Sequence, residues 1–280
     1  MTSMSVCPRS QGLFTLDIEE ITAALRTVMF NVRGLMPLAE GGHGAVLRVH
    51  RNGGGDALVV KVVPVDDRLA LEYELQCLTY VRQAGIHSPA PALPDVVFTG
   101  SCACMVMGYV EGHEARTVGD AAAVGRELAR LHALPLPVFA AQGSFMGLPL
   151  LAQGIVPTEM KTLLPCDPWE MAGQLASENL AIGLSHGDFM PSNILTDHSG
   201  ATLLDFGNMG RDCFGADVAR YCLGGCLAHQ ITNETLLCES FLGGYSTIKP
   251  LDSPLVRCLP KLVYLAGFRI ALWRYSHRES

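Results

Sequence analysis

The chain contains the stretch Ser185-His-Gly-Asp-Phe-Met-Pro-Ser-Asn-Ile-Leu195, followed closely by Leu203-Leu-Asp-Phe-Gly207. Between these two stretches, short strands are predicted at Ile194–Thr196 and Ala201–Leu204, joined by a turn at Asp197-His-Ser-Gly200. An antiparallel hairpin returns the chain to the place where it began. The residues that flank this hairpin are therefore expected to emerge at the same end.

Three polar side chains flank the hairpin or precede it on the same loop. Asn193 comes just before the first strand and Asp205 just after the second. An amide oxygen and a carboxylate that converge suit Mg²⁺, because this hard cation prefers oxygen ligands. Asp188 lies on the loop before Asn193 and is placed to reach an attacking hydroxyl while the metal holds phosphates. The pattern predicts phosphoryl transfer, with Asp188 as the catalytic residue and Asn193 and Asp205 as metal ligands.

Four spaced motifs resemble the aminoglycoside phosphotransferase family, small-molecule relatives of the protein kinases. His186–Leu195 is similar to its catalytic loop, H-G-D-x-x-x-x-N, where protein kinases have H-R-D, and Asp205-Phe-Gly207 resembles the metal-binding motif. Asp217-Val-Ala219 stands where the family has a D-L-A aspartate that braces the catalytic loop. Leu128-Ala-Arg-Leu-His132 resembles the L-A-x-L-H helix. The resemblance covers roughly residues 35–225 and implies transfer of the γ-phosphoryl group of ATP.

The resemblance also implies that Lys61 holds the α- and β-phosphates, oriented by a glutamate on the following helix. Glu72 and Glu74 are both candidates. At 100° per residue, Glu74 lies about 45° from the centre of the apolar stripe of that helix, and Glu72 about 115°. We therefore expect Glu74 to point toward Lys61. The stripe consists of Leu71, Leu75, Leu78 and Val81.

A glycine-rich turn precedes the strand that starts at Ala45. Gly41, Gly42 and Gly44 fit a turn that covers phosphates, because missing side chains let backbone N–H groups approach anionic oxygens. The turn departs from the full G-x-G-x-x-G pattern of protein kinases.

A second nucleotide-binding segment is implied by the family resemblance. Met107, Gly108, Tyr109 and Val110 resemble the hinge whose backbone pairs with adenine. Gly108 stands where an acidic residue is frequent in the family, which matters little if only backbone groups bind. The expected cofactors are therefore ATP and Mg²⁺.

The first part of the chain is rich in predicted strands. Asp66 and Asp67 open one large helix that continues to about Ala84 and ends at Gly85. A shorter helix is expected to begin at Thr15, which would serve as its N-terminal cap. The predicted strands are Ala45–His50, Ala57–Val63, Val96–Thr99 and Ala103–Gly108.

After Glu111-Gly112 the pattern changes to helices. Asp120 is predicted to cap one helix, and Asp167-Pro-Trp-Glu170 to start another that ends around Gly183. We expect an α+β, bilobal protein-kinase-like fold: an N-terminal antiparallel β-sheet lobe with one main helix and a mainly helical C-terminal lobe. The expected boundaries are a tail at 1–13, an ATP-binding lobe at 14–107, a hinge at 108–112, and a lobe at 113–280 that carries the catalytic loop, metal site and acceptor pocket.

Composition narrows the class of partner. A net charge of −7 and a pI near 5.7 disfavour nucleic acid. No apolar stretch is long enough to predict a membrane span. The ten cysteines lack paired zinc-site spacing and follow no signal-peptide pattern, so we expect reduced thiols in a cytoplasmic protein. The expected protein is a monomer or weak dimer that phosphorylates a small hydroxylated molecule, with an aminoglycoside or other antibiotic as the leading instance.

Two alternatives remain open from the residues. The first is a protein serine/threonine kinase, which agrees with the motif Asp205-Phe-Gly207. Against it, Gly187 replaces the arginine that binds an activation-loop phosphate in protein kinases. The segment between Gly207 and Asp217, Asn208–Ala216, is also too short for a peptide-binding activation segment. A nucleotide-binding scaffold without catalysis is the other. A basic C-terminal segment, with Arg269, Arg274 and Arg278, weakens the case for a polycationic acceptor.

Three further polar residues carry weaker expectations. His186 is expected to hydrogen-bond the loop rather than transfer protons, and His132 to pack in the core. Asp212 is as readily a surface turn residue as a second acid.

Overall fold

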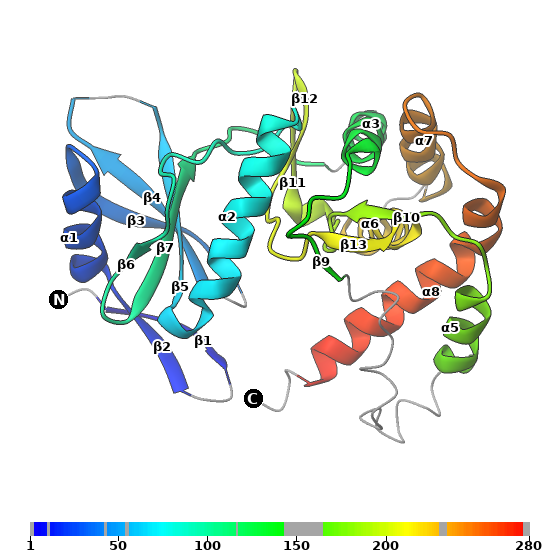
Figure 1. The fold of residues 1–280 in the computed structure, drawn as a ribbon, viewed down its shortest axis with the longest axis horizontal. Coiled ribbons are helices and arrows are strands. Elements are labelled where there is room, and N and C mark those ends of the chain that lie inside the picture. The colour runs from blue at the N-terminus through cyan, green and yellow to red at the C-terminus, as the bar shows by residue number, and fades with distance from the viewer. Residues whose placement is uncertain are drawn as a thin grey trace. The chain divides into compact units, whose positions relative to one another are not determined.

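The protein divides into two compact units, Met1–Glu111 and Gly112–Glu279 (Figure 1). The structure is a computed structural model of the 280-residue chain. It describes residues 3–9, 12–41, 44–53, 56–115, 117–142, 165–229 and 234–276.

A five-stranded antiparallel sheet forms the centre of the first unit, with strand order β3-β4-β5-β7-β6. Two helices, α1 and α2, accompany it, and a hairpin of β1 and β2 precedes it (Figure 1). The elements are β1 Ser3–Arg9, β2 Gly12–Asp17, α1 Ile18–Val28, β3 Val32–Gly41, β4 Gly44–Arg51, β5 Leu58–Pro64, a 3₁₀ turn at Val65–Asp67, α2 Arg68–Gln83, β6 Val97–Phe98 and β7 Cys102–Gly108.

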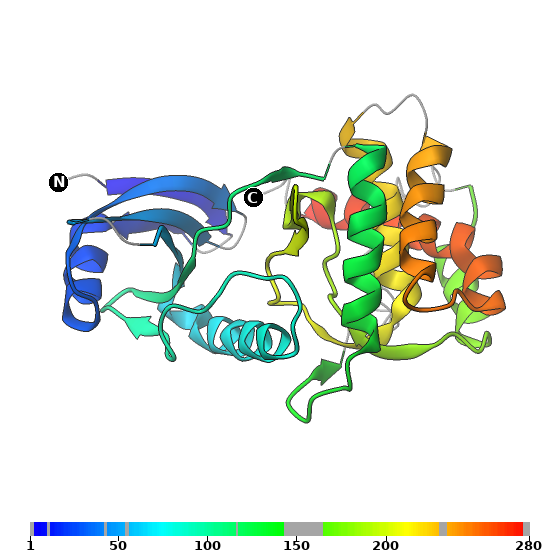
Figure 2. The same cartoon turned by 90° about the horizontal axis from the view of Figure 1, so that it is seen from above.

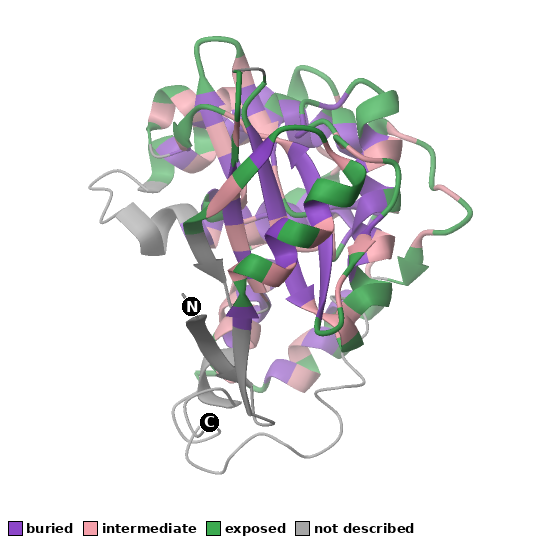
Figure 3. Ribbon diagram, turned by 90° about the vertical axis from the view of Figure 1, so that its left-hand side faces the viewer, coloured by how far each residue is buried: buried purple, intermediate pink, exposed green. Residues whose placement is uncertain are grey.

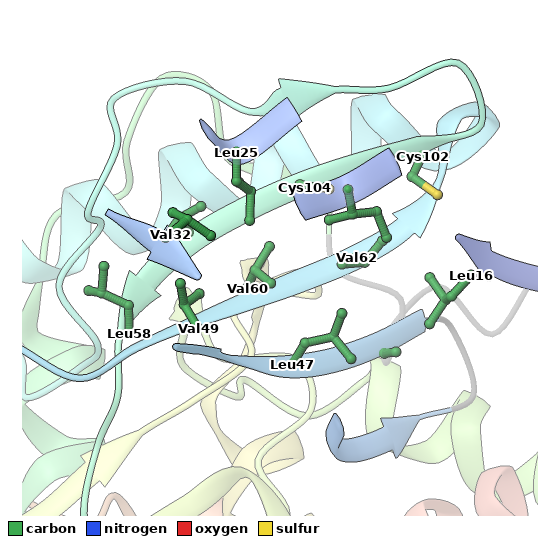
Figure 4. Close-up of a cluster of buried hydrophobic side chains, with 13 residues drawn as sticks. Leu16, Leu25, Val32, Leu47, Val49, Leu58, Val60, Val62, Cys102 and Cys104 are labelled. Atoms are coloured by element: carbon green, nitrogen blue, oxygen red, sulfur yellow. The ribbon is translucent and has the colours of Figure 1, made fainter. Parts of the chain in front are cut away.

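Alternation along β5 separates the two faces of this sheet. Val60 and Val62 are fully buried and belong to one core cluster, whereas Lys61 between them points to the opposite face. Leu25 of α1 packs into the same cluster (Figure 4). Buried residues run along the central strands (Figure 3). The core therefore lies between the sheet and α1, and Lys61 is left on the other face.

The first unit differs from expectation at its N-terminal end. Residues 1–13 were expected as a tail, yet β1 and the first two residues of β2 lie there, and the two strands pair antiparallel. The predicted cap Thr15 is wrong: it lies in β2, and Asp17 caps α1 by accepting hydrogen bonds from the N–H groups of Glu19 and Glu20. The periodicity of Ile21 and Leu25 does not say how far upstream the helix begins.

Strand β3 was not predicted from the sequence. It contains Pro37, which normally argues against a strand because proline cannot donate a ladder hydrogen bond. β3 is the edge strand of the sheet, and its register shifts between Pro37 and Ala39. An edge position with a bulge tolerates proline.

The second unit is mainly helical and carries two small three-stranded sheets, ordered β12-β11-β8 and β10-β13-β9. Its elements are β8 His113–Glu114, α3 Val118–Ala133, β9 Ala141–Gln142, α5 Pro168–Ala176, β10 Ile182–Ser185, a 3₁₀ turn at Pro191–Asn193, β11 Ile194–Asp197, β12 Gly200–Leu203, β13 Gly210–Cys213, α6 Phe214–His229, α7 Glu234–Ser246 and α8 Ser253–Ser276. Within the described residues, no helix is long and apolar enough to cross a membrane.

Helices α3 and α7 pack side by side, as both ribbon views show (Figures 1 and 2). A Cβ at Gly125 of α3 would collide with the carbonyl oxygen of Phe241, and one at Gly244 of α7 with that of Ala122. Glycine at both positions therefore allows the two backbones to approach closely.

Two local predictions in the second unit are wrong, and one of the two alternatives for Asp212 is excluded. Asp120 does not cap α3: Thr117 does, and Asp120 closes the capping box. The helix that starts after Asp167 ends at Ala176, because β10 begins soon afterwards. Asp212 is a buried residue of β13 rather than a surface turn.

Candidate active site

The first unit contains an ion pair between the two residues expected to hold phosphates. Lys61 Nζ lies 2.9 Å from Oε1 and 2.8 Å from Oε2 of Glu74. The Lys61 side chain is 18% exposed and that of Glu74 8%. Glu74 thus lies on the face of α2 that helix geometry indicates. The role of the pair toward a nucleotide remains a prediction.

The glycine turn connects β3 and β4 on the same sheet. Gly41 ends β3 and pairs with Gly44, the first residue of β4; Gly42 lies outside the described residues. Gly44 has a φ of +156°, and a Cβ there would collide with the carbonyl oxygen of Val62. No side chain fits at Gly44, so the turn lies directly against the strand that carries Lys61.

The predicted hinge leaves the sheet at the end of β7. Met107 pairs with Val59 of β5, and the N–H groups of Gly108 and Tyr109 donate to the carbonyls of Ala90 and Ala57, each at 2.8 Å. Arg48 of β4 lies 4.8 Å from the centre of the Tyr109 ring, a cation–π contact. These contacts fix the start of the hinge backbone.

Val110, the last predicted hinge residue, is partly exposed. Across residues 56–115, its N–H group takes part in no backbone hydrogen bond. Val110 thus lies beyond the backbone contacts that fix Gly108 and Tyr109.

In the second unit, Asn193 and Asp188 are in direct contact. The Asn193 side-chain nitrogen donates to the main-chain carbonyl of Asp188 at 2.9 Å and to its Oδ2 at 3.0 Å. Because the nitrogen faces Asp188, the amide oxygen Oδ1 is left to accept or to coordinate. Both residues are half-buried.

The hairpin brings Asn193 to the end where Asp205 emerges, as the sequence predicts. β11 and β12 pair antiparallel from Ile194 opposite Leu203, and the Leu204 N–H donates to the Asn193 carbonyl at 2.9 Å. Asp205 follows Leu204, is exposed, and adopts a left-handed φ of +59°. The hairpin therefore brings the residue before Asp205 into backbone contact with Asn193.

This donor set fits Mg²⁺. Asn193 and Asp205 offer hard oxygen atoms, and phosphate oxygens commonly complete such a site. In the part of the chain that the structure describes, no group of three or more His, Cys, Asp or Glu residues could hold a metal by itself. Two protein oxygen ligands would leave coordination positions of Mg²⁺ for phosphate oxygens and water.

His186 holds the loop in the way that was expected. Its Nε2 lies 3.0 Å from the carbonyl oxygen of Leu204, and the Asp188 N–H points at its Nδ1 at 3.4 Å. A carbonyl only accepts, so Nε2 carries the proton and Nδ1 accepts. His186 thereby ties the residue before Asp205 to Asp188.

Asp217 of α6 is fully buried beneath this loop. Its carboxylate accepts hydrogen bonds from the Ser185 hydroxyl at 2.8 Å and from the N–H groups of His186 at 2.6 Å and Gly187 at 3.0 Å. Burial raises the pKa of Asp217, but the hydrogen bond from His132 and the charge of Arg220 outweigh burial and lower the pKa to about 2. Asp217 is therefore an ionised brace for the backbone immediately before Asp188.

Gly187, where protein kinases have arginine, is a crowded position. It has a left-handed φ of +82°, and a Cβ there would collide with the main-chain carbonyl of Asn208. The segment after Asp205-Phe-Gly207 therefore packs directly on the catalytic loop.

The sequence did not predict the hydrogen-bond partners of His132, nor any role for Tyr245. His132 is buried as expected, but it also hydrogen-bonds Asp217 at 3.1 Å and the Tyr245 hydroxyl at 2.9 Å. Tyr245 itself was not singled out; its one signal is a phenol among the apolar residues of its helix.

Arg269 of α8 lies within electrostatic range of Asp188. It continues the face of α8 on which Leu262, Leu265 and Ala266 are buried. Burial and the charge of Arg220 lower the pKa of Arg269 to about 10, while Asp212 and Asp188 act in the opposite direction. Asp188 is therefore the weakest of the four influences on the pKa of this cation.

Several solved structures share the fold at low identity. Amicoumacin kinase hAmiN, in complex with AMP-PNP, Ca²⁺ and Ami, has a TM-score of 0.74 at 15% identity, with 95% of this chain and 87% of that chain covered. Aminoglycoside phosphotransferase APH(3'')-Id from Streptomyces rimosus, in complex with ADP and streptomycin, has a TM-score of 0.63 at 22% identity, covering 90% and 99%. A choline/ethanolamine kinase family protein from Mesorhizobium loti has a TM-score of 0.62 at 17% identity, covering 91% and 82%.

These likenesses confirm the expected α+β kinase-like fold, with an antiparallel sheet and helix first and a helical part after it. No curated protein matches the chain. The model of the phosphotransferase enzyme family matches residues 35–250. The chain therefore belongs to the phosphotransferase enzyme family, and it is an ATP-dependent kinase that phosphorylates a hydroxyl group of a small molecule.

Proposed function

We propose that Asp188 is the catalytic base of a Mg²⁺-dependent transfer of the γ-phosphoryl group of ATP to a hydroxyl of an antibiotic. The observation that carries this proposal is the contact between Asn193 and Asp188 beside Asp205. One amide thus fixes the orientation of the carboxylate with its nitrogen while its oxygen faces the metal position. Base and metal ligand are held by the same short loop.

In this mechanism Asp188 orients the acceptor hydroxyl and accepts its proton as the oxygen attacks phosphorus. The carboxylate remains half-exposed, so an acceptor can reach it. Asn193 and Asp205 would hold Mg²⁺, which neutralises phosphate charge when it is bound. Asp217 and His186 keep the loop backbone in place while the proton moves.

The first unit would position the nucleotide. Lys61, oriented by Glu74, would hold the α- and β-phosphates, and the glycine turn at Gly41–Gly44 would cover them. The Val110 N–H supports adenine binding because no backbone group competes for it within residues 56–115. These roles follow the division of labour in kinase-type phosphoryl transfer.

An antibiotic acceptor is favoured by the solved structures that share the fold, two of which are described with amicoumacin or streptomycin. Arg269, in electrostatic range of Asp188, disfavours a dense positive charge on the part of the acceptor that lies there. We therefore favour an antibiotic that presents a neutral or acidic portion next to the reacting hydroxyl over a polycationic aminoglycoside.

The alternative of a protein serine/threonine kinase has less support. Gly187 is packed against Asn208 and leaves no room for the arginine that would bind an activation-loop phosphate. The family match points the same way, to a small-molecule kinase.

The test is ATP turnover by the purified chain against a panel of antibiotics, sugars and amino alcohols. Asp188→Ala should keep ATP binding and lose phosphorylation of the acceptor that the panel identifies by about a hundredfold or more. Asp197→Ala, in the exposed hairpin turn, is the matched control and should keep full turnover. Undiminished phosphorylation by Asp188→Ala would exclude Asp188 as the base, and labelled phosphate on added proteins alone would support the protein kinase.

A further inference from the structure

A phenol on α7 reaches the brace of the catalytic loop through one histidine. The Tyr245 hydroxyl lies 2.9 Å from Nδ1 of His132, and Nε2 of His132 lies 3.1 Å from Oδ2 of Asp217. All three side chains are buried. The chain of contacts therefore runs from α7 through α3 to α6, and from Asp217 to the loop before Asp188.

The direction of each hydrogen bond in this chain follows from charge and burial. Asp217 is ionised and can only accept, so Nε2 of His132 carries the proton. Burial lowers the pKa of His132, so the ring is neutral and Nδ1 must accept. Burial raises the pKa of Tyr245, which therefore remains a protonated donor. Tyr245 donates to His132, and His132 donates to Asp217.

Close packing of α3 and α7 sets this contact. Gly244, the neighbour of Tyr245, lies directly against Ala122 of α3. The Tyr245 ring meets the His132 ring edge-on at 5.6 Å, while Phe214 stacks on the other side at 4.4 Å. The two rings therefore confine the imidazole, and the Tyr245 hydroxyl supplies the hydrogen bond that its Nδ1 accepts.

We propose that Tyr245 is a positioning residue for phosphoryl transfer: its hydroxyl donates to Nδ1 of His132 and so holds the ring with Nε2 directed at Asp217. Asp217 then holds the N–H groups of His186 and Gly187 that place Asp188. This inference rests on the proposed role of Asp188. Without the hydroxyl, the buried Nδ1 loses its donor, and the ring loses the hydrogen bond that fixes its orientation toward Asp217.

The first measurement reads the tautomer directly and needs no activity. In the chain labelled with ¹⁵N-histidine, NMR should show His132 protonated at Nε2, with the signal assigned by its loss in His132→Gln. Tyr245→Phe should keep this tautomer, because the Asp217 carboxylate requires a donor, and should shift the Nδ1 resonance, because that nitrogen loses its hydrogen bond. A wild-type His132 protonated at Nδ1 would overturn the inference. Because this readout is independent of turnover, it separates failure of the hydrogen-bond chain from failure of the proposed function.

The second measurement is kinetic, with MgATP and water as the acceptor and ADP release as the signal. Tyr245→Phe should lower kcat about three- to tenfold, the value of one buried hydrogen bond, with an unchanged KM for ATP. Tyr264→Phe is the matched control, because its hydroxyl bonds the Cys166 carbonyl on an exposed surface. This control should keep the wild-type kcat.

Two amide substitutions test the two ring nitrogens of His132 separately. His132→Gln places a nitrogen near Nε2 and keeps a donor to Asp217 without an acceptor for Tyr245. His132→Asn places its amide near Nδ1 and loses the donor to Asp217. Tyr245→Phe should therefore add no loss of kcat to His132→Gln, and His132→Asn alone should lower kcat more than His132→Gln. An equal effect of Tyr245→Phe with and without His132→Gln, or an unchanged kcat in Tyr245→Phe, would overturn the inference.

Discussion

Each unit of the molecule contains a buried carboxylate with a basic partner, and the two pairs differ in how far the basic partner is exposed. Glu74 in the first unit is paired with Lys61, whose side chain remains 18% exposed. Asp217 in the second unit is paired with His132, and both side chains have no exposure. The first pair presents a cation to its surroundings, whereas the second presents nothing.

This difference separates a binding element from a support. A partly exposed ammonium can interact with an anionic ligand, because Glu74 orients it without covering it. Asp217 already accepts from Ser185, His186, Gly187 and His132. It has no capacity left for a substrate and can only hold the loop. Loss of Asp217 should therefore damage stability and turnover together, and loss of Lys61 mainly ATP use.

The largest effect is expected from Asp217→Asn. An amide nitrogen in place of one carboxylate oxygen would face donors, and at least one buried donor would lose its acceptor. The free energy of unfolding should fall by about 3–5 kcal/mol, with a collapse of turnover. Denaturant unfolding measures this, with Asp197→Asn in the exposed turn as the matched control that should leave the midpoint nearly unchanged. A fully stable Asp217→Asn would mean that the brace is dispensable.

The second prediction concerns the packing of the catalytic loop and uses Gly187→Ala. Gly187 and Gly85 share a left-handed φ, +82° and +84°, but a Cβ at Gly85 meets nothing within 4 Å. Gly85→Ala should therefore cost only the backbone strain, about 1–2 kcal/mol. Gly187→Ala should cost about 1–3 kcal/mol more, because Asn208 must move. Unfolding of both variants tests this: equal losses would show that Asn208 does not press on the loop.

A single and a double substitution test whether the ion pair of the first unit serves ATP turnover or stability alone. Lys61→Met leaves the nearly buried Glu74 without this partner and should destabilise by about 1–3 kcal/mol. Lys61→Met with Glu74→Met replaces both charges by apolar groups and should recover most of that loss. ATP turnover should stay low in both variants. Recovery of turnover with stability would show that the pair is only structural.

In the second unit, the sequence predicts the hairpin of the candidate active site better than the buried residues that hold the catalytic loop. The hairpin that carries Asn193 and Asp205 is local, so strand alternation and a turn suffice to predict that its ends meet. His132 and Asp217 touch across 85 residues, and Tyr245 and His132 across 113. A single sequence carries no signal for such a pairing, since a buried histidine and tyrosine in apolar helices are indistinguishable from ordinary core residues.

In the first unit, the limits lie at edges and ends. Helix periodicity selects Glu74 over Glu72 because the apolar stripe fixes the buried face. Strand β3 escapes prediction, since Pro37 opposes it and only its place at the sheet edge admits it. The hairpin before α1 escapes for a related reason: pairing between β1 and β2 is a tertiary fact, whereas the segment by itself has no strong alternation.

The smallest expected effect is a pH dependence of stability that comes from the His132–Asp217 pair. His132 has a pKa below its ordinary value because it is buried, so below pH 6.5 the unfolded chain binds a proton that the folded chain does not. Its neutral state contributes stability that is complete above about pH 6.5 and is lost as pH falls. The groups that face it are Asp217 of α6, Tyr245 of α7, His186 of the catalytic loop, and Lys249.

The contribution of Asp217 lies in a lower window. Its folded pKa of about 2 is below the ordinary 3.8, so that stability is lost only as pH falls from about 4 toward 2. Between pH 6.5 and 4, His132→Gln should therefore remove a slope of at most about 1.4 kcal/mol per pH unit from the unfolding free energy. Denaturant unfolding of both proteins at pH 7.5, 6 and 5 measures the difference, in which the other histidines cancel. Identical slopes would mean that His132 titrates normally. The contact between His132 and Asp217 would then not be a buried hydrogen bond from a neutral imidazole to a carboxylate, and it would not differ in this respect from the Lys61–Glu74 ion pair.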